Sequence, residues 1–214
     1  MVDVSGLRSV NSRSGGGRSR FSSIEIRDIV ITDIVLSFAF AIAVCRPLSN
    51  NVDSIWFAEW ILLALFFVTF SFLFHELGHK YTAQFYGAWS EYRMFPRGLL
   101  FSVLISFTGF LFAAPGAVYI RGNITPKENG IISAAGPVVN FAIAAAAMLF
   151  MTFTGGGLYF ILSELAYLNA FLGLFNMIPV PPLDGSKVLG WGIKPYLGTV
   201  AVGVVELAFV FLVL

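Results

Sequence analysis

Long apolar runs, separated by short polar stretches, follow one another along most of the chain. A helix of roughly 20 residues crosses a hydrocarbon core of about 30 Å, so runs of this length are predicted to be membrane-spanning helices. Five runs share this length and carry few charges: 29–45, 56–86, 131–153, 156–178 and 196–214. Residues 24–214 are therefore predicted to form one membrane domain.

A further apolar run, at 99–120, has a less uniform pattern. Gly109 and the Pro115–Gly116 pair interrupt it, and its second half reads AVYIR, which is β-branched and aromatic in character. Hydropathy alone predicts a span here, whereas the second half favours an extended strand. The pattern thus predicts an all-α polytopic membrane protein with five or six membrane segments and one re-entrant or strand-like element.

Composition excludes the soluble classes of protein. Hydrophobic residues make up 57% of the chain and charged residues 12%, whereas a soluble domain averages about 25% charged residues. The net charge of +1 provides no basic face for a nucleic acid, and we expect no nucleic-acid partner. Cys45 is the only cysteine, so neither an internal disulfide nor a cysteine-based zinc cluster can form.

Residues 1–23 differ from the rest of the chain. They are rich in Gly, Ser and Arg and lack the apolar segment of a signal peptide, so a disordered polar tail is predicted. Their arginines place the N-terminus in the cytoplasm by the positive-inside rule.

The only two histidines, His75 and His79, stand four residues apart in the sequence HELGH. Positions i and i+4 share one helical face, so both imidazoles can bind one metal ion while Glu76 lies beside them. Such ligands suit zinc, and a glutamate next to zinc can take a proton from water that the metal acidifies. The motif follows the apolar WILLALFFVTFSFLF, and ionisable groups at membrane depth usually mark function. The alternative, a helix with two interfacial histidines, leaves the spacing to chance.

A catalytic zinc site normally has three protein ligands, and with no third histidine the third must be a carboxylate. Asp184 is the candidate, because it lies in PVPPLDG directly after the run at 156–178. The prolines forbid a regular helix before it, and Gly185 frees the backbone after it. Unwound backbone at membrane depth is tolerated where protein or a water-filled cavity surrounds it. The alternative is a proline-rich turn with a solvated aspartate.

Three motifs together carry a family resemblance: HELGH, GPVVN at 136–140 and NMIPVPPLDG at 176–185. They resemble the site-2 protease family of intramembrane zinc metalloproteases (peptidase family M50), in a minimal form without a PDZ or CBS domain. The resemblance covers roughly residues 59–190. It implies a three-helix catalytic core made by the runs at 56–86, 131–153 and 156–178.

The resemblance also implies the composition of the site. One zinc ion per chain would be held by His75, His79 and Asp184, with Glu76 as general base. The substrates would be transmembrane helices of other proteins, cleaved in the lipid bilayer. Asn140 and Asn176 occupy the family's asparagine positions and are candidates for binding the substrate. For Asn140, the alternative is an amide that only packs between membrane helices.

Counting the crossings decides between five and six spans. From a cytoplasmic N-terminus, the histidine pair lies toward the cytoplasmic end of the second span, and two later crossings return Asp184 to that side. A full crossing by 99–120 would separate the ligands, so this run is predicted to be re-entrant or interfacial. Residues 117–120 are predicted to form an extended edge for an unwound substrate, with Tyr119 and Arg121 as further candidate contacts.

Two other functions use the same features. A metal transporter would need polar groups relaying the ion to both aqueous faces, and the sequence has no second His or Asp cluster for this. A metal-binding protein without activity would usually have lost the glutamate or a ligand. A purely structural membrane protein leaves HELGH and LDG unexplained. The sequence therefore favours a zinc metalloendopeptidase.

Overall fold

The computed structural model describes residues 21–47, 50, 52–111 and 115–213. Five helices in this part of the chain are long and apolar enough to cross a membrane, which confirms the predicted fold class. They are α1 (Ser23–Cys45), the continuous rod Ser54–Phe85, α5 (Pro126–Met151), α6 (Gly156–Asn176) and α8 (Ile193–Val213). The chain is an integral membrane protein. Of the polar tail predicted at 1–23, residues 1–20 lie outside the described residues, and Ser22 caps α1 by accepting a hydrogen bond from the Glu25 amide.

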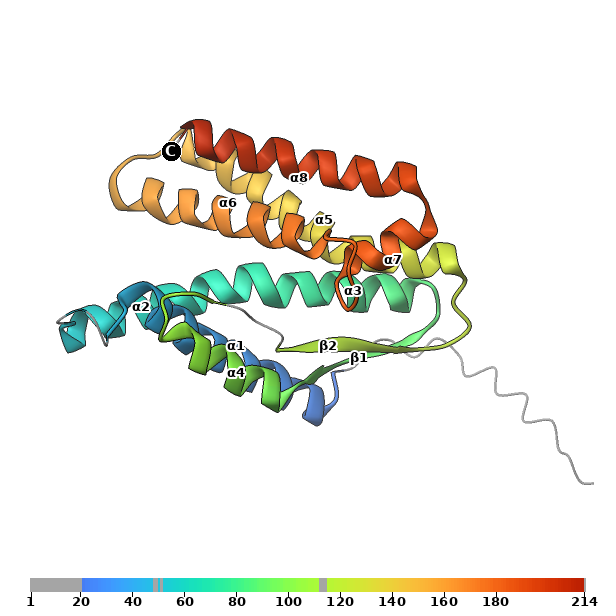
Figure 1. The fold of residues 1–214 in the computed structure, drawn as a ribbon, viewed down its shortest axis with the longest axis horizontal. Helices are drawn as coiled ribbons and strands as arrows, with labels where there is room; N and C mark the ends of the chain where they lie inside the picture. Colours follow the sequence, from blue (N-terminus) through green and yellow to red (C-terminus); the bar gives the residue numbers. More distant parts are fainter. Residues whose placement is uncertain (1–20, 48–49, 51, 112–114, 214) are drawn as a thin grey trace, which may run out of the picture.

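The rod consists of α2 (Ser54–Val68), a π-helical turn η1 (Thr69–Leu73) and α3 (Phe74–Phe85). It runs through the middle of the molecule (Figure 1). Helices α5, α6 and α8 lie on one side of it, and α1 lies on the other with a short helix and a hairpin. Helices α3, α5 and α6 pack in succession, which is the three-helix core that the motifs imply.

The apolar run at 99–120 does not form a spanning helix. Its first part belongs to α4 (Pro96–Ser106), whose 11 residues cover only about 16 Å at 1.5 Å per residue. Its second part is β2 (Gly116–Arg121), which pairs antiparallel with β1 (Trp89–Met94). The strand-like element predicted from the AVYIR pattern is thus present, beside the C-terminal half of the rod (Figure 1).

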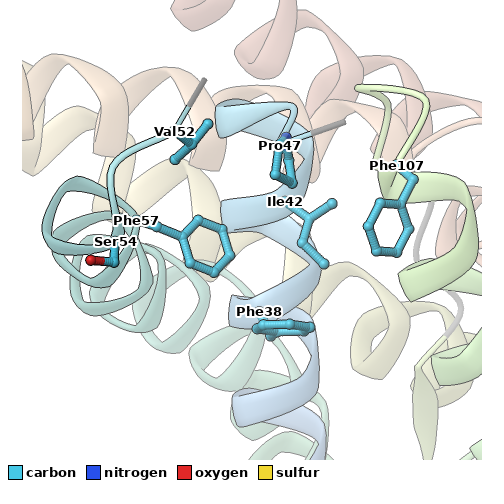
Figure 2. A pocket seen from close by; sticks show the side chains of 7 residues that line it. All are labelled: Phe38, Ile42, Pro47, Val52, Ser54, Phe57 and Phe107. Carbon is cyan, nitrogen blue, oxygen red and sulfur yellow. The ribbon is translucent and has the colours of Figure 1, made fainter. Parts of the chain in front are cut away.

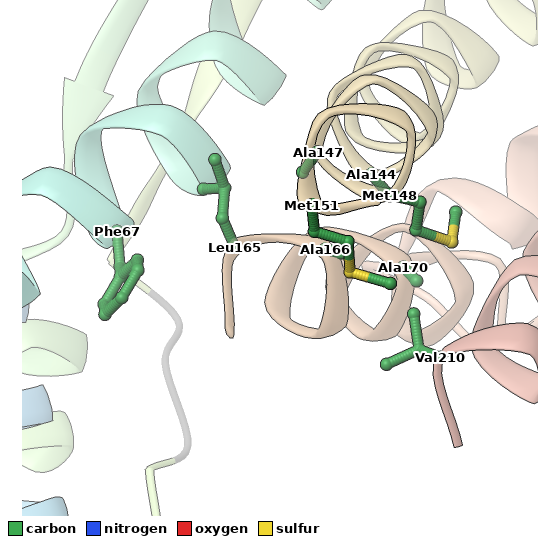
Figure 3. Close-up of a cluster of buried hydrophobic side chains, with 9 residues drawn as sticks. All are labelled: Phe67, Ala144, Ala147, Met148, Met151, Leu165, Ala166, Ala170 and Val210. Carbon is green, nitrogen blue, oxygen red and sulfur yellow. The ribbon is translucent and has the colours of Figure 1, made fainter. Parts of the chain in front are cut away.

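Small residues bring the spanning helices into close contact. The largest buried cluster places Ala144 and Ala147 of α5 against Ala166 and Ala170 of α6, with Val210 of α8 beside them (Figure 3). Apolar side chains gain little by leaving lipid, so membrane helices depend on this close packing. The cluster therefore fixes α5 and α6 relative to each other.

An apolar cavity of about 260 Å³ opens between the C-terminal part of α1, the start of α2 and the end of α4 (Figure 2). Phe38, Ile42, Phe57 and Phe107 form most of its wall. None of its lining side chains titrates, so it offers no chemistry. It lies at the opposite ends of α1 and of the rod from the histidines.

Candidate metal centre

His75 and His79 lie one turn apart on α3, and both are buried. Their Nε2 atoms are 3.0 Å apart, so the two imidazoles face a common point. Asp184 joins them through Oδ2, at 3.3 Å from His75 Nε2 and 3.1 Å from His79 Nε2. The three candidate ligand atoms all lie within 4.8 Å of one another. Residues that the sequence separates by more than a hundred positions thus form one cluster.

The segment after α6 carries Asp184 to the histidines. It is irregular from residue 177 to 183, and Figure 1 shows it dipping towards α3 before α7 (Asp184–Trp191) begins. Gly185 is required there, because a Cβ would lie 2.1 Å from the carbonyl oxygen of Met177. The chain therefore folds back directly onto the end of α6, and the first residue of α7 points its carboxylate at α3.

Gly136 of α5 makes room for the imidazoles. A Cβ at this position would lie 2.4 Å from His79 Nε2 and 2.7 Å from His75 Cε1. The glycine of the GPVVN motif is thus explained by the close approach of the α5 backbone to both histidines.

Hydrogen bonds at the far ring nitrogens determine which atoms the histidines present. His79 Nδ1 lies 2.7 Å from the carbonyl oxygen of Ile132, which can only accept, so Nδ1 carries the proton. His75 Nδ1 lies 2.6 Å from Asn140 Oδ1. The Asn140 amide nitrogen donates to the backbone carbonyl of Ser71 (2.8 Å), which leaves its oxygen to accept from His75.

Both Nε2 atoms therefore present lone pairs toward each other and toward a carboxylate. Three acceptors converge with no proton between them, an arrangement that a cation stabilises. Two neutral imidazoles and one carboxylate match the three protein ligands of a catalytic zinc site. The residues present thus fit one zinc ion.

Charge around Asp184 agrees with this interpretation. Lys187, one turn further along α7, places its ammonium 3.7 Å from Asp184 Oδ1. The nearby ammonium favours the carboxylate form of Asp184, which is the form that binds metal.

Glu76 lies beside the cluster and is half-buried. Its carboxylate accepts a hydrogen bond from the backbone N–H of Val118 in β2 and lies within electrostatic range of His75, Asp184 and Lys187. The glutamate therefore stands between the candidate metal ligands and the strand of the hairpin.

The structure places the two candidate asparagines differently. Asn140 is fully buried beneath His75, with protein partners at both its amide oxygen and its nitrogen. This position favours orienting the histidine over contacting a substrate. Asn176 is half-buried at the end of α6 and donates to the carbonyl oxygen of Leu172 in its own helix. Its contact with a substrate stays a prediction.

Sequence reasoning missed several polar residues that the fold brings to this region. Ser71 and Asn169 are buried next to Asn140, and polar side chains inside predicted spans were the signal for them. Glu25, at the start of α1, is buried in an ion pair with Lys80, at 2.6 Å. This pair is buried because β1 packs against α1 and Lys80 of α3 reaches its first turn.

The site and the fold together define the class of protein: a membrane protein with a buried cluster of two histidines and one carboxylate that could hold a metal ion. Comparison with known proteins gives the family. The chain is 40% identical over 176 residues to the "Putative zinc metalloprotease MJ0611" of Methanocaldococcus jannaschii, covering 80% of this chain and 86% of that protein. It is 32% identical over 160 residues to the "Zinc metalloprotease MJ0392" of the same organism, covering 73% of this chain and 41% of that protein.

A third relative is the "Putative zinc metalloprotease YwhC" of Bacillus subtilis, 33% identical over 142 residues, with 56% of this chain and 64% of that protein covered. No family model matches the chain, and no solved structure matches it. The chain belongs to the zinc metalloprotease family of these relatives. Together with its five apolar helices, this makes it a membrane zinc protease.

Proposed function

We propose that this chain is an intramembrane metalloprotease of the site-2 type, which hydrolyses peptide bonds within or near transmembrane helices of other proteins. One observation carries the proposal. Two histidine lone pairs and the Asp184 carboxylate converge beside Glu76, at the end of a helix that is long and apolar enough to span a bilayer. A substrate helix could meet this cluster without leaving the membrane.

His75, His79 and Asp184 would hold one zinc ion. A bound zinc ion lowers the pKa of water to about 7 and polarises a carbonyl group as a Lewis acid. Glu76 acts as general base: its carboxylate takes the proton from the attacking water and passes it to the departing amine nitrogen. The Val118 N–H orients that carboxylate.

The hairpin offers one edge to the substrate. On the outer edge of β1, the Tyr92 N–H donates to Glu25 Oε1 (3.0 Å) and the Met94 N–H to Asp28 Oδ2 (3.3 Å). Carboxylates of α1 therefore occupy two of the donors of that edge. The sheet has two strands in the described part of the chain, so the outer edge of β2 is the one left for strand addition.

That edge of β2 faces the general base. The Val118 N–H points away from β1 toward Glu76, and in an antiparallel pair every second residue does the same. Gly116 and Ile120 therefore share this direction with Val118. An unwound substrate segment pairing with these residues would gain the backbone hydrogen bonds that lipid cannot supply. Its scissile bond would then lie next to Glu76.

The distribution of charge supports a cytoplasmic site and N-terminus. The described part of the chain has nine Lys and Arg residues, and all but Arg46 belong to the end of the molecule that carries the site. The eight are Arg27, Lys80, Arg93, Arg97, Arg121, Lys127, Lys187 and Lys194. Cationic residues are enriched on the cytoplasmic side of membrane proteins.

A cleavage assay with matched variants tests the proposal. Purified chain in detergent is given a single-span substrate, and the wild type is compared with Glu76→Gln and with the control Glu59→Gln. Glu59 is an exposed glutamate on the same rod, far from the site. Cleavage by the wild type and the control but not by Glu76→Gln is expected. Equal cleavage by all three would refute the role of Glu76, and metal uptake into vesicles without cleavage would favour a transporter.

A further inference from the structure

Three buried polar residues lie behind His75, on the side away from the other ligands. Ser71 comes from η1, Asn140 from α5 and Asn169 from α6, and the two asparagines are fully inaccessible. Buried amides in a membrane bundle are costly unless every donor and acceptor has a partner. Their hydrogen bonds can therefore be traced one by one.

The hydrogen-bond network begins at the backbone carbonyl of Leu165, which can only accept. The amide nitrogen of Asn169 donates hydrogen bonds to this carbonyl oxygen (3.0 Å) and to Ser71 Oγ (3.0 Å). Asn169 Oδ1 is thereby left as an acceptor, and the amide nitrogen of Asn140 donates a hydrogen bond to it (2.8 Å). Each amide in turn determines the orientation of the next.

The hydrogen-bond network ends at His75, one of the candidate metal ligands. With its nitrogen donating to Asn169 and to the Ser71 carbonyl, Asn140 can offer only its oxygen to His75 Nδ1. His75 must then carry its proton on Nδ1 and present a bare Nε2 to the metal side. His79 reaches the same state by a separate route, through the carbonyl oxygen of Ile132.

The π-helical turn contributes to this network. In η1 the Phe74 N–H bonds to the carbonyl oxygen of Thr69, five residues earlier. Both oxygens of Ser71, backbone and side chain, accept hydrogen bonds from other helices. Single π-helical turns often occur at functional sites, and this one links the rod to α5 and α6 one turn before His75.

The geometry points to Asn169 as a positioning residue for the metal centre: together with the Ser71 carbonyl, it holds the Asn140 amide in the orientation that keeps the proton on His75 Nδ1 and leaves Nε2 for the metal. The inference rests on the proposed function only in taking the histidine cluster as a metal site. Asn169 itself touches neither histidine by any hydrogen bond of the described residues. Its effect is therefore expected to reach His75 and to leave His79 unchanged.

The tautomers can be measured without metal or substrate. The chain has two histidines, so a long-range ¹H–¹⁵N spectrum of zinc-free protein labelled at histidine shows only two imidazoles. In the wild type, both are expected to be protonated at Nδ1, and Asn140→Leu identifies the signals of His75. In Asn169→Leu, His75 is expected to populate the Nε2–H form while His79 keeps its shifts. Loss of an outer partner typically weakens metal binding 10–100-fold, and about tenfold is expected here.

Control variants separate positioning from general disruption. Ser163→Ala removes another buried polar group of α6, which bonds to Phe160 of its own helix, and it should change neither histidine. Asn169→Asp keeps an oxygen acceptor for Asn140 and should restore the wild-type state of His75. Asn169→Ala gives the same reading as the leucine variant should that variant not fold.

An unchanged His75 in both Asn169→Leu and Asn169→Ala would overturn the inference, and so would equal changes at both histidines. Because this readout needs no cleavage, a protein without protease activity would still report it. Failure of the proposed function and failure of this inference are therefore distinguishable.

Discussion

Gly136→Ala should strongly weaken metal binding while leaving the membrane fold in place. The added Cβ would lie 2.4 Å from His79 Nε2, where ordinary contact begins at 3.4 Å. Relief therefore requires a displacement of about 1 Å (3.4 − 2.4). His75 and His79 cannot move away freely, because hydrogen bonds to Asn140 and Ile132 hold their far nitrogens.

The size of the effect follows from this displacement. Metal–ligand distances tolerate only about 0.2 Å, so a shift of about 1 Å removes at least one ligand. We expect zinc affinity to fall by at least about 100-fold, which corresponds to about 2.7 kcal/mol. The substitution should stabilise helix α5 itself, since alanine is about 1 kcal/mol more favourable than glycine inside a helix. A loss of zinc would therefore come from the site and not from α5.

The assay is zinc content by elemental mass spectrometry, together with competition against a chelator. Gly190→Ala is the matched control, because a Cβ there meets nothing within 4 Å and α7 also carries Asp184. The control should retain zinc at wild-type affinity. If Gly136→Ala also bound zinc with unchanged affinity, the proposed position of the metal between α3 and α5 would be refuted.

Three further predictions concern the parts around the site. Gly185→Ala should lose zinc, because its Cβ would meet backbone 2.1 Å away, and elemental analysis beside the tolerant Gly198→Ala measures this. Lys80→Met should lower the thermal stability in detergent, because it leaves Glu25 buried without its partner. Such losses cost about 3–5 kcal/mol, and an unchanged melting curve would contradict the buried ion pair. Val118→Pro should keep zinc but lose cleavage, since it removes the N–H that faces the general base; full activity would exclude that edge from the mechanism.

The sequence predicted the spanning helices and the histidine pair because both depend on local patterns. A run of about 20 apolar residues is a span wherever it packs, and an i, i+4 pair shares a face in any helix. Asp184 was reachable as well, since prolines and a glycine mark the broken segment that presents it. The prediction that the prolines prevent a regular helix before Asp184 is also confirmed, because residues 177–183 are irregular.

Contacts between distant segments could not be predicted from the sequence. Glu25 and Asp28 lie in the first two turns of α1, yet they accept hydrogen bonds from the edge of β1 more than sixty residues away. Nothing local distinguishes them from solvated acids. Asn169 and Ser71 are unremarkable polar residues in apolar runs until α5 and the π-helical turn bring them together. Partners of this kind are decided by packing, which one sequence does not reveal.

Zinc content and cleavage measured on the same purified protein test the central claim most directly. The wild type, Glu76→Gln and Asp184→Ala are compared with a single-span substrate in detergent. We expect about one zinc per chain in the wild type and in Glu76→Gln, none in Asp184→Ala, and cleavage by the wild type alone. Full zinc in Asp184→Ala, or cleavage by Glu76→Gln at the wild-type rate, would contradict the account.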